Sequence, residues 1–227
     1  MKFIVIEGLD GSGKSTQLKL LTEYLERQNY KHKYLHFPRT DSPVYGELIA
    51  RFLRGELGDI DTVNPYLISL IYAGDRKDAS GMIQNWLSDN YIVIADRYMY
   101  SNIAFQCAKL KDEKEREKLA VWIKDFEYNY NKIPEPHLNL FLNVPFEFTE
   151  RSLTKNRTGQ DRDYLKGVND IHEENLDFQR KVLDVYLWQV DRNDDFEMVD
   201  CRDDEGGILN PEKISDLIIR KCEAIGL

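Results

Sequence analysis

The chain has 227 residues, of which 42% are hydrophobic and 31% charged, and its formal net charge is −9. This length suits one medium-sized domain, so we expect a single domain over residues 1–227. The acidic balance argues against a general nucleic-acid or anionic-membrane surface, because either partner is attracted by a basic field. A local cluster of arginines can still bind phosphate inside a cleft.

The cysteines and the start of the chain indicate where in the cell the protein is expected to be. Cys107, Cys201 and Cys222 are widely spaced. They predict neither a disulfide framework nor a zinc site, and such sparse cysteines are typical of a reducing cytosol. The apolar start at residues 3–6 is too short for a signal peptide, and no run is long enough to span a membrane. We therefore expect a cytoplasmic protein.

Strand and helix patterns alternate along the chain. Short apolar runs predict buried strands over residues 3–6, 34–37, 91–95, 138–144 and 196–199. Apolar residues recur at helical spacing after Ser15, over residues 113–130 and 182–190, and after Pro211. This alternation predicts an α/β fold of three layers, in which a five-stranded parallel sheet is flanked by helices.

A phosphate-binding loop follows the first predicted strand. Residues 8–15 read Gly-Leu-Asp-Gly-Ser-Gly-Lys-Ser, which matches G-x-x-x-x-G-K-[ST]. Glycines let the backbone point successive N–H groups at phosphate oxygens, and the following helix offers its N-terminus to an anion. Lys14 supplies charge between the β- and γ-phosphates, and the Ser15 hydroxyl is a Mg²⁺ ligand. The sequence thus predicts a P-loop NTPase fold that binds a nucleoside triphosphate through Gly8, Leu9, Asp10, Gly11, Ser12, Gly13, Lys14, Ser15 and Thr16.

A second set of polar residues ends the predicted strand at 91–95. Asp96 and Arg97 follow it directly. In a parallel sheet, ligands bind outside the carboxyl ends of the strands. An Asp at this position can reach the Mg²⁺ shell, and an Arg can hold a phosphate with its planar fork of donors. The alternative is a surface ion pair of little energetic value.

Several motifs in order resemble those of the thymidylate kinase family, and the resemblance covers almost the whole chain. They are the loop segment at 6–16, Phe37-Pro38-Arg39, the helical Tyr72-Ala-Gly-Asp-Arg76, the run Asp-Arg-Tyr-Met-Tyr-Ser-Asn-Ile-Ala-Phe at 96–105, and the arginine-bearing stretch at 151–162. The resemblance implies an enzyme that uses ATP and Mg²⁺ to convert dTMP to dTDP in dTTP biosynthesis. It also implies a homodimer.

The same resemblance implies roles in the acceptor site. Asp10 would meet the 3′-hydroxyl of dTMP, and Arg39 and Arg97 would hold its 5′-phosphate. The base pocket would contain Tyr72 stacked on thymine, Arg76 donating to a thymine carbonyl, and Ser101, Phe105 and Gln106 nearby. Because some relatives read Pro-Glu-Arg where this chain reads Pro38-Arg39, the register of Arg39 can differ.

Catalysis would depend on alignment and charge neutralisation rather than on a protein nucleophile. Gly11 stands where some relatives carry an arginine, and relatives without it usually supply the arginine from a lid. We expect a lid at about residues 151–168, where Arg157 or Arg162 would close over the phosphates. Lys14, Asp10, Arg97 and these two arginines are the expected catalytic residues.

Other functions stay open from the sequence. The nearest alternative is another P-loop kinase that acts on dUMP, dGMP or a deoxynucleoside. Arg39, in place of a carboxylate that could act as a base, favours a phosphorylated acceptor. A regulatory ATPase or GTPase with a protein partner is a second alternative, but the chain has no Asn-Lys-x-Asp guanine-binding motif. Intact Lys14, Ser15 and Asp96 argue against a binding protein without catalysis.

Overall fold

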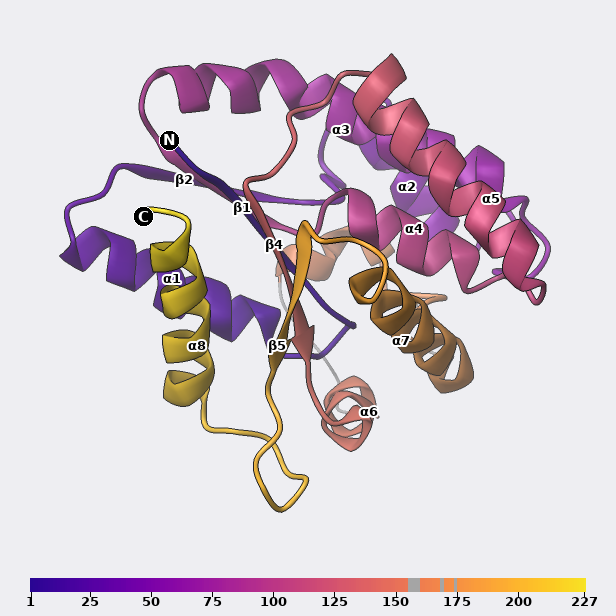
Figure 1. Cartoon of the computed structure of the whole chain (residues 1–227). Helices are drawn as coiled ribbons and strands as arrows, with labels where there is room; N and C mark the ends of the chain where they lie inside the picture. The colour runs from indigo at the N-terminus through magenta and orange to yellow at the C-terminus, as the bar shows by residue number, and fades with distance from the viewer. Residues whose placement is uncertain (155–159, 168–169, 174) are drawn as a thin grey trace.

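Five parallel strands form one sheet in the computed structural model, which describes residues 1–154, 160–167, 170–173 and 175–227. The strands are β1 (Phe3–Glu7), β2 (His32–His36), β3 (Ile92–Asp96), β4 (Leu138–Asn143) and β5 (Phe196–Asp200). Their order across the sheet is β2-β3-β1-β4-β5, and every neighbouring pair is parallel (Figure 1). The predicted five-stranded parallel sheet is confirmed.

Eight α-helices and two other helical segments surround the sheet in the described part of the chain. The α-helices are α1 (Lys14–Arg27), α2 (Tyr45–Leu53), α3 (Pro65–Ser88), α4 (Met99–Cys107), α5 (Glu113–Lys124), α6 (Phe146–Thr154), α7 (Leu176–Val190) and α8 (Pro211–Ala224). A π-helix, η1 (Asp125–Tyr130), continues α5, and a 3₁₀-helix, η2 (Gln160–Leu165), follows α6. None of the helices that the structure describes is long and apolar enough to cross a membrane.

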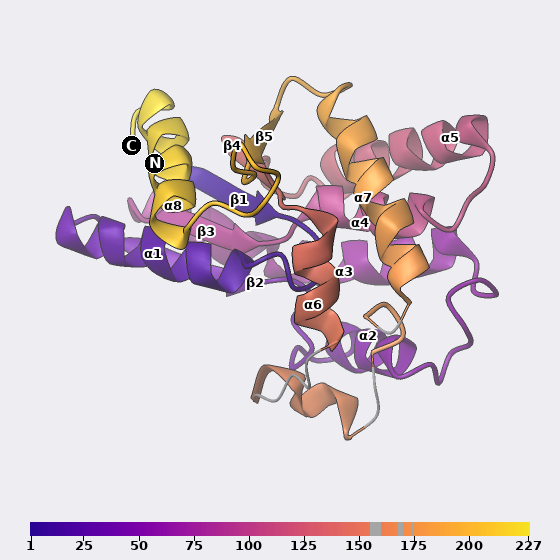
Figure 2. The same ribbon diagram turned by 90° about the horizontal axis from the view of Figure 1, so that it is seen from below.

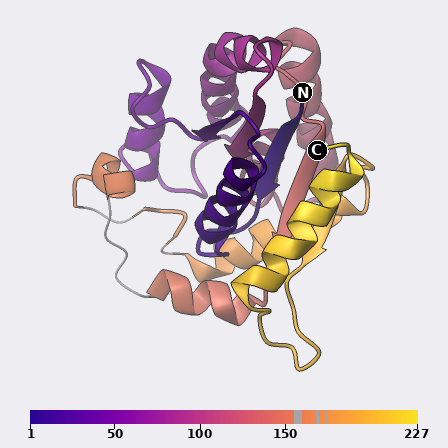
Figure 3. The ribbon, with the colours of Figure 1, turned by 90° about the vertical axis from the view of Figure 1, so that its left-hand side faces the viewer.

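The strands place alternate side chains in two hydrophobic layers. On β1, Ile4 and Ile6 join the core against α1 and α8, whereas Phe3 and Val5 join the core that includes α3, α4, α5 and α7. Successive side chains of a strand point to opposite faces, so a strand with only apolar residues is buried on both. Figure 3 shows α1 and α8 side by side on their face of the sheet. The predicted three-layer arrangement is therefore confirmed.

The second strand departs from its prediction. The run at 34–37 was expected to be buried, but β2 lies at the edge of the sheet and its residues are half-buried or exposed. Tyr34 is 47% exposed. The pattern of β2 is that of an edge strand with one covered side, so the prediction of a fully buried strand is wrong here.

The topology fixes where the functional loops meet. Ile6 on β1 is paired with Asp96 on β3. The phosphate loop after β1 and the Asp96–Arg97 segment after β3 therefore leave the sheet next to each other. Figure 2 shows that α6 crosses in front of this carboxyl-terminal edge, with α2 and η2 beyond it. This edge is where the sequence predicts the ligands to bind.

Candidate active site

The phosphate loop has its lysine folded back on the loop itself. Lys14 Nζ donates to the carbonyl oxygens of Leu9 (2.9 Å) and Gly8 (3.3 Å). Burial and the positive charge of Arg97 lower the pKa of Lys14 to about 8, although Asp96, Asp10 and Glu7 oppose the shift. An anion near Lys14 would raise this pKa again, because it would stabilise the charged form of the amine. The role of Lys14 toward phosphate, expected from the sequence, stays a prediction.

Gly11 explains one departure from the family pattern. Its φ of +73° lies in the left-handed region, and a Cβ added there would come within 2.9 Å of Ser152 Cβ on α6. Glycine avoids both the backbone strain and the collision. The loop lies directly against α6, so this position has no room for the arginine that some relatives carry.

Asp96 and Ser15 are the residues expected to hold a magnesium ion, and Asp96 has a buried oxygen, free within the described residues, that suits this role. Asp96 is 5% exposed, its Oδ2 lies 3.3 Å from His36 Nδ1, and its Oδ1 has no hydrogen-bond partner in the described part of the chain. Burial by itself raises the pKa of Asp96, but Lys14 and His36 lower it overall, so the carboxylate is ionised. Ser15 is exposed at the start of α1.

The remaining ligands of such an ion would not be protein side chains. Among the residues that the structure describes, no group of three or more His, Cys, Asp or Glu side chains could hold a metal. Mg²⁺ commonly uses one or two protein ligands together with phosphate oxygens and water. The donor set at Asp96 and Ser15 therefore suits an ion that arrives with a nucleotide.

Arg97 and Asp10 form an ion pair between the two functional loops. Arg97 Nη2 lies 2.7 Å from Asp10 Oδ1, and Gln179 Nε2 of α7 donates to Asp10 Oδ2 at 3.0 Å. Burial alone would raise the pKa of Asp10, but Arg97 and Lys14 hold it below its usual range. Arg97 has a left-handed φ of +66°, which aims its side chain across the end of β1. The structure brings together Asp10, Lys14 and Arg97, three of the expected catalytic residues.

The buried carboxylate of Glu7 is hydrogen-bonded to Ser101 and Tyr186, the residues that also bind Arg97. Glu7 Oε1 accepts from the backbone N–H groups of Tyr98 (2.8 Å) and Ser101 (3.2 Å), at the start of α4. Its Oε2 accepts from the Ser101 hydroxyl and from Tyr186 Oη (3.0 Å). Arg97 Nη1 in turn donates to Ser101 Oγ (3.1 Å) and Tyr186 Oη (3.2 Å). Burial raises the pKa of Glu7. Ser101, expected near the base, thus serves here to orient Arg97.

Arg39 is bound to α3. Its backbone N–H and Nε donate to the Asp75 carboxylate at 2.9 and 2.8 Å, and its Nη2 lies 2.6 Å from Asp78 Oδ2. Burial by itself lowers the pKa of Arg39, but the two carboxylates raise it overall. Among the described contacts, none links Arg39 to Arg97. Its expected role at the acceptor phosphate stays a prediction and would require this side chain to leave α3.

Two of the expected base-pocket residues, Ser101 and Phe105, contact Arg97. The guanidinium carbon of Arg97 lies 5.0 Å from the centroid of the Phe105 ring. The phenol of Tyr72 has its pKa raised by burial and by the negative charges of Asp170 and Asp10. Phe105 therefore lies beside Arg97, and the role of Tyr72 toward an acceptor base stays a prediction.

Two further residues expected to contact the base are deeply buried. Arg76 is 2% exposed and is paired with Glu127 of η1 through Nε (2.5 Å) and Nη2 (2.7 Å). Gln106 is fully buried, and both atoms of its amide group have no partner within the described residues. Their roles toward a base stay predictions.

The expected lid at 151–168 begins inside α6, which ends at Thr154. Arg151 is exposed on this helix. Arg157 lies outside the described residues, and for Arg162 only the backbone is described, within η2. The end of η2 is attached to α2 by a 2.7 Å hydrogen bond from Arg54 Nη1 to the carbonyl oxygen of Tyr164. The lid arginines therefore remain an expectation.

Asp170 is a buried carboxyl group next to the acceptor site. Its Oδ2 accepts from Tyr164 Oη (2.9 Å) and its Oδ1 from the backbone N–H of His172 (2.8 Å). Burial and the charge of Asp10 raise the pKa of Asp170 to about 7. The neighbouring His172 ring is packed against Phe105 and Phe178, and burial lowers its pKa to about 3. The turn at 170–173 thus holds two buried groups whose charged forms are disfavoured, within electrostatic reach of Asp10.

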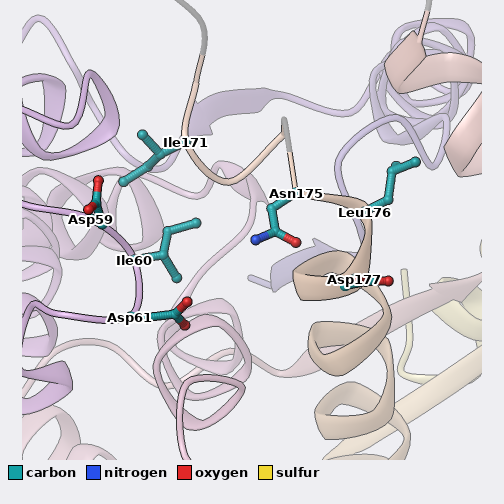
Figure 4. A pocket seen from close by; sticks show the side chains of 7 residues that line it. All are labelled: Asp59, Ile60, Asp61, Ile171, Asn175, Leu176 and Asp177. Carbon is teal, nitrogen blue, oxygen red and sulfur yellow. The ribbon is translucent and has the colours of Figure 1, made fainter.

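A separate hollow of about 530 Å³ opens between the loop before α3 and the start of α7 (Figure 4). Asp59, Asp61 and Asp177 line it, together with Ile60 and Ile171. Three carboxylates repel the phosphates of a nucleotide. This hollow therefore does not compete with the phosphate loop as the nucleotide site.

Sequence reasoning missed Glu7, Gln179, Tyr186 and Glu127. One signal was available for Glu7, because a charged residue at the end of an otherwise apolar strand is unusual. The other three lie on helical faces whose partners come from distant parts of the sequence. Nothing in their local pattern separates them from ordinary polar residues.

Comparisons with known proteins agree with this geometry. The family model described as thymidylate kinase matches residues 6–206. The thymidylate kinase of Plasmodium falciparum is 32% identical over 195 residues, which covers 82% of this chain and 86% of the relative. A probable thymidylate kinase of Thermococcus kodakarensis is 30% identical, with 92% and 93% covered. The solved structure of Candida albicans thymidylate kinase has a TM-score of 0.71 at 25% identity and covers 98% of this chain and 91% of its own.

Proposed function

Because this chain belongs to the thymidylate kinase family and is therefore a phosphotransferase, we propose that it transfers the γ-phosphoryl group of ATP to dTMP at the carboxyl-terminal edge of its sheet. One observation carries the proposal. The phosphate loop with Lys14 and the Arg97–Asp10 pair meet at the ends of neighbouring strands β1 and β3. A donor phosphate and an acceptor phosphate would therefore be held side by side.

On the donor side, the loop would hold ATP through its backbone N–H groups and the N-terminus of α1. Lys14 would exchange its carbonyl partners, Gly8 and Leu9, for phosphate oxygens. Ser15 and Asp96 would hold Mg²⁺, which when bound neutralises charge on the donor phosphates. The charge of the donor phosphates must be neutralised because the attacking group is an anionic phosphate oxygen, which they would otherwise repel.

On the acceptor side, Arg97 is the residue best placed to hold the 5′-phosphate of dTMP. Its ion pair with Asp10 is partly buried, so exchanging that carboxylate for a phosphate keeps the guanidinium paired. Asp10 would then be free to accept a hydrogen bond from the 3′-hydroxyl of the sugar. Tyr72 and Phe105 would cover the base. Arg39 would join this site only after leaving Asp75.

The lid completes the proposal. Arg157 or Arg162 would approach the transferring phosphoryl group when the lid closes, in the manner of an arginine finger. We expect Arg162→Ala to lower kcat by at least about tenfold with a smaller change in the KM of ATP, since the contact would form in the transition state. Full turnover in Arg162→Ala would remove Arg162 from the mechanism, and the same measurement on Arg157→Ala would then decide between them.

A second copy of the chain is the proposed partner. Leu67 and Leu70 of α3 are 59% and 38% exposed, and Tyr130 of η1 is 77% exposed. Leu70 and Phe126 line one shallow hollow, and Phe126 is stacked against Tyr130. We name this apolar surface the α3–η1 face, defined by Leu67, Leu70, Phe126 and Tyr130. Exposed apolar surfaces of this kind commonly mark protein interfaces.

The proposed reaction is tested by coupled ADP release with ATP and Mg²⁺, offering dTMP, dUMP, dGMP and thymidine one at a time. We expect dTMP to give the highest kcat/KM. The Candida albicans enzyme is described as having broad substrate specificity, so the comparison among acceptors decides which nucleotide this chain prefers. Higher turnover with another acceptor would overturn the assignment of dTMP, and ADP release without any acceptor would indicate an ATPase.

A matched pair of variants ties this turnover to the phosphate loop. Lys14→Ala removes the buried amine, whereas Lys19→Ala removes an amine from the same helix whose side chain is 77% exposed. We expect a loss of at least about a hundredfold in kcat/KM for Lys14→Ala, since it removes a charge from the transition state. Lys19→Ala should keep wild-type turnover. Equal activity of the two variants would contradict the role of the loop.

A further inference from the structure

His36 is a half-exposed side chain at the carboxyl end of β2 that the proposed chemistry does not use. Its Nδ1 lies 3.3 Å from Asp96 Oδ2, and 50% of the side chain is exposed. None of the motifs that indicate nucleotide binding includes this residue. An exposed cation beside a carboxylate is often an incidental surface pair of little energetic value. This pair differs from that case, because its carboxylate is buried and belongs to the expected metal site.

The sheet brings the two side chains together by its register. His36 on β2 is paired with Asp96 on β3, which is paired in turn with Ile6 on β1. Residues paired across neighbouring strands project their side chains to the same face of the sheet. Ile6 belongs to the core against α1, so all three side chains lie on the α1 face. Ser15, the other expected metal ligand, stands in the first turn of that helix. The contact is therefore built into the strand pairing.

His36 engages one oxygen of Asp96 and leaves the other available. The contact with Oδ2 is the one ion pair of this carboxylate among the described residues. Oδ1 is buried and has no hydrogen-bond partner in the same part of the chain. A buried polar atom without a partner is costly, so it often indicates a water or an ion that the site holds. A carboxylate that is held through Oδ2 presents Oδ1 in a defined direction.

We infer that His36 is a positioning residue that holds Asp96 Oδ2 and thereby orients Oδ1 toward the divalent ion that enters with the nucleotide. Carboxylates that bind metals are themselves hydrogen-bonded, and loss of such a supporting partner lowers metal affinity by about 10- to 100-fold. His36 itself would not contact the ion. The inference rests on the proposed function, since it takes Asp96 as part of the Mg²⁺ site.

Isothermal titration calorimetry of nucleotide binding tests the inference without turnover. The probe is β,γ-methylene-ATP, an ATP analogue that cannot transfer its γ-phosphoryl group, and no acceptor is present. Its Kd is measured with saturating MgCl₂ and again in EDTA, and the Kd in EDTA divided by the Kd with MgCl₂ gives the contribution of the ion. We expect His36→Ala to lower this ratio by about tenfold. The Kd in EDTA should change by less than about twofold, because an exposed side chain is replaced and the phosphate loop is untouched.

Two further variants separate this orienting role from a general loss of stability. His36→Asn keeps an N–H donor near the position of Nδ1, so it should restore the ratio to within about threefold of the wild-type value. His32→Ala is the matched control, because this histidine lies on the same face of β2 but is paired with Ile92, and its Nδ1 is 3.5 Å from the Tyr30 carbonyl oxygen. It should keep the wild-type ratio. Circular dichroism establishes that each variant is folded.

The contrary results are distinct. The inference is wrong if His36→Ala keeps the wild-type ratio, or if His36→Asn is no better than His36→Ala. It is also wrong if His36→Ala raises the ratio, since the histidine would then compete with the ion for Asp96. A wild-type Kd that is the same in MgCl₂ and EDTA would remove the expected metal site and the inference with it. A wild-type protein that shows the metal effect but does not phosphorylate dTMP would overturn the proposed reaction and leave the role of His36 standing.

Discussion

Arg97 shows how single side chains are held ready in this cleft. Its guanidinium contacts Asp10 from the phosphate loop, Ser101 from α4 and Tyr186 from α7. Each contact comes from a different element, so the side chain has little freedom. Such preorganisation lowers the cost of orienting a charged group when a phosphate arrives. The residues that hold Arg97 should therefore matter for turnover even where they touch no substrate.

Tyr186→Phe tests this directly, because it removes one hydroxyl group and keeps the ring stacked on Phe141. We expect kcat/KM for dTMP to fall by about tenfold, since Arg97, Ser101 and Glu7 all lose a buried partner. The KM of ATP should change little. Tyr100→Phe is the matched control, because its hydroxyl binds Asp195 away from the cleft. Equal effects of the two substitutions in steady-state kinetics would contradict the role of Tyr186.

Asp170 predicts a pH dependence of stability. Its folded pKa of about 7 lies above the ordinary value of 3.8, so the folded protein keeps a proton that the unfolded chain loses. The stability due to this carboxyl group is complete below about pH 4 and is lost as the pH rises through 7. In Asp170→Asn the side chain cannot ionise, so its contribution to stability does not change with pH. The variant's free energy of unfolding relative to wild type should therefore rise by about 1–3 kcal/mol between pH 4.5 and pH 8.

Urea unfolding at the two pH values measures this difference. Asp184→Asn, which changes an exposed carboxyl group on α7, is the control and should show no such trend. A constant difference between Asp170→Asn and wild type from pH 4.5 to pH 8 would show that Asp170 ionises normally.

The sequence predicted those site residues whose signal is local. Lys14 and Ser15 belong to a contiguous motif, and Asp96 and Arg97 follow a strongly apolar strand. Tyr186 was predicted only as part of a helix, because its contact with Glu7 joins residues 179 positions apart. Pairings over such distances depend on the packing of α7 against the sheet. Hydrophobic periodicity specifies that packing only in outline.

At the scale of elements, the contact between the phosphate loop and α6 is the least expected feature. Thr149 and Ser152 of α6 are the nearest neighbours of a Cβ added at Gly11. The helices α2, α4 and α6 have nine residues each, and none was specifically bounded from the sequence. Helices this short are marginal without tertiary packing, so their sequence signal is weak. The helices α1, α5, α7 and α8 gave clearer patterns, whereas the long α3 was not predicted from apolar periodicity.

Gly11→Ala tests the contact between the loop and α6. The added Cβ would come within 2.9 Å of Ser152, so α6 or the loop must move. Gly206→Ala is a matched control, because its φ of +81° is also left-handed but nothing lies within 4 Å of the added Cβ. Both variants should lose about 1 kcal/mol of stability from backbone strain. Only Gly11→Ala should raise the KM of ATP, and equal KM values would contradict the argument.

At the scale of the whole molecule, the strand order determines which chemistry is possible. With β1 between β3 and β4, the donor loop has the Asp96–Arg97 segment on one side and α6 after β4 on the other. The alternating pattern predicted the parallel sheet and its layers, but not that β2 would be a half-exposed edge. The α3–η1 face belongs to the same two elements that pair Arg76 with Glu127 in the interior.

Leu70→Glu tests the proposed dimer. A charge in the α3–η1 face should convert a dimer to a monomer in sedimentation or light scattering at micromolar concentration, because burying an unpaired carboxylate is unfavourable. Tyr30→Glu, at an apolar side chain that is 41% exposed near β2, should leave the assembly unchanged. A wild-type chain that is already monomeric, or a dimer unaffected by Leu70→Glu, would contradict this interface.

The central claim is transfer of a phosphoryl group between two nucleotides held side by side. The most direct measurement is to incubate the wild-type protein with ATP labelled in its γ-phosphate, Mg²⁺ and dTMP, and to separate the products. We expect the label to appear in dTDP as ADP forms, in equal amounts. Label released as inorganic phosphate, whether or not dTMP is present, would show that water is the acceptor and that the cleft is not the site of a kinase.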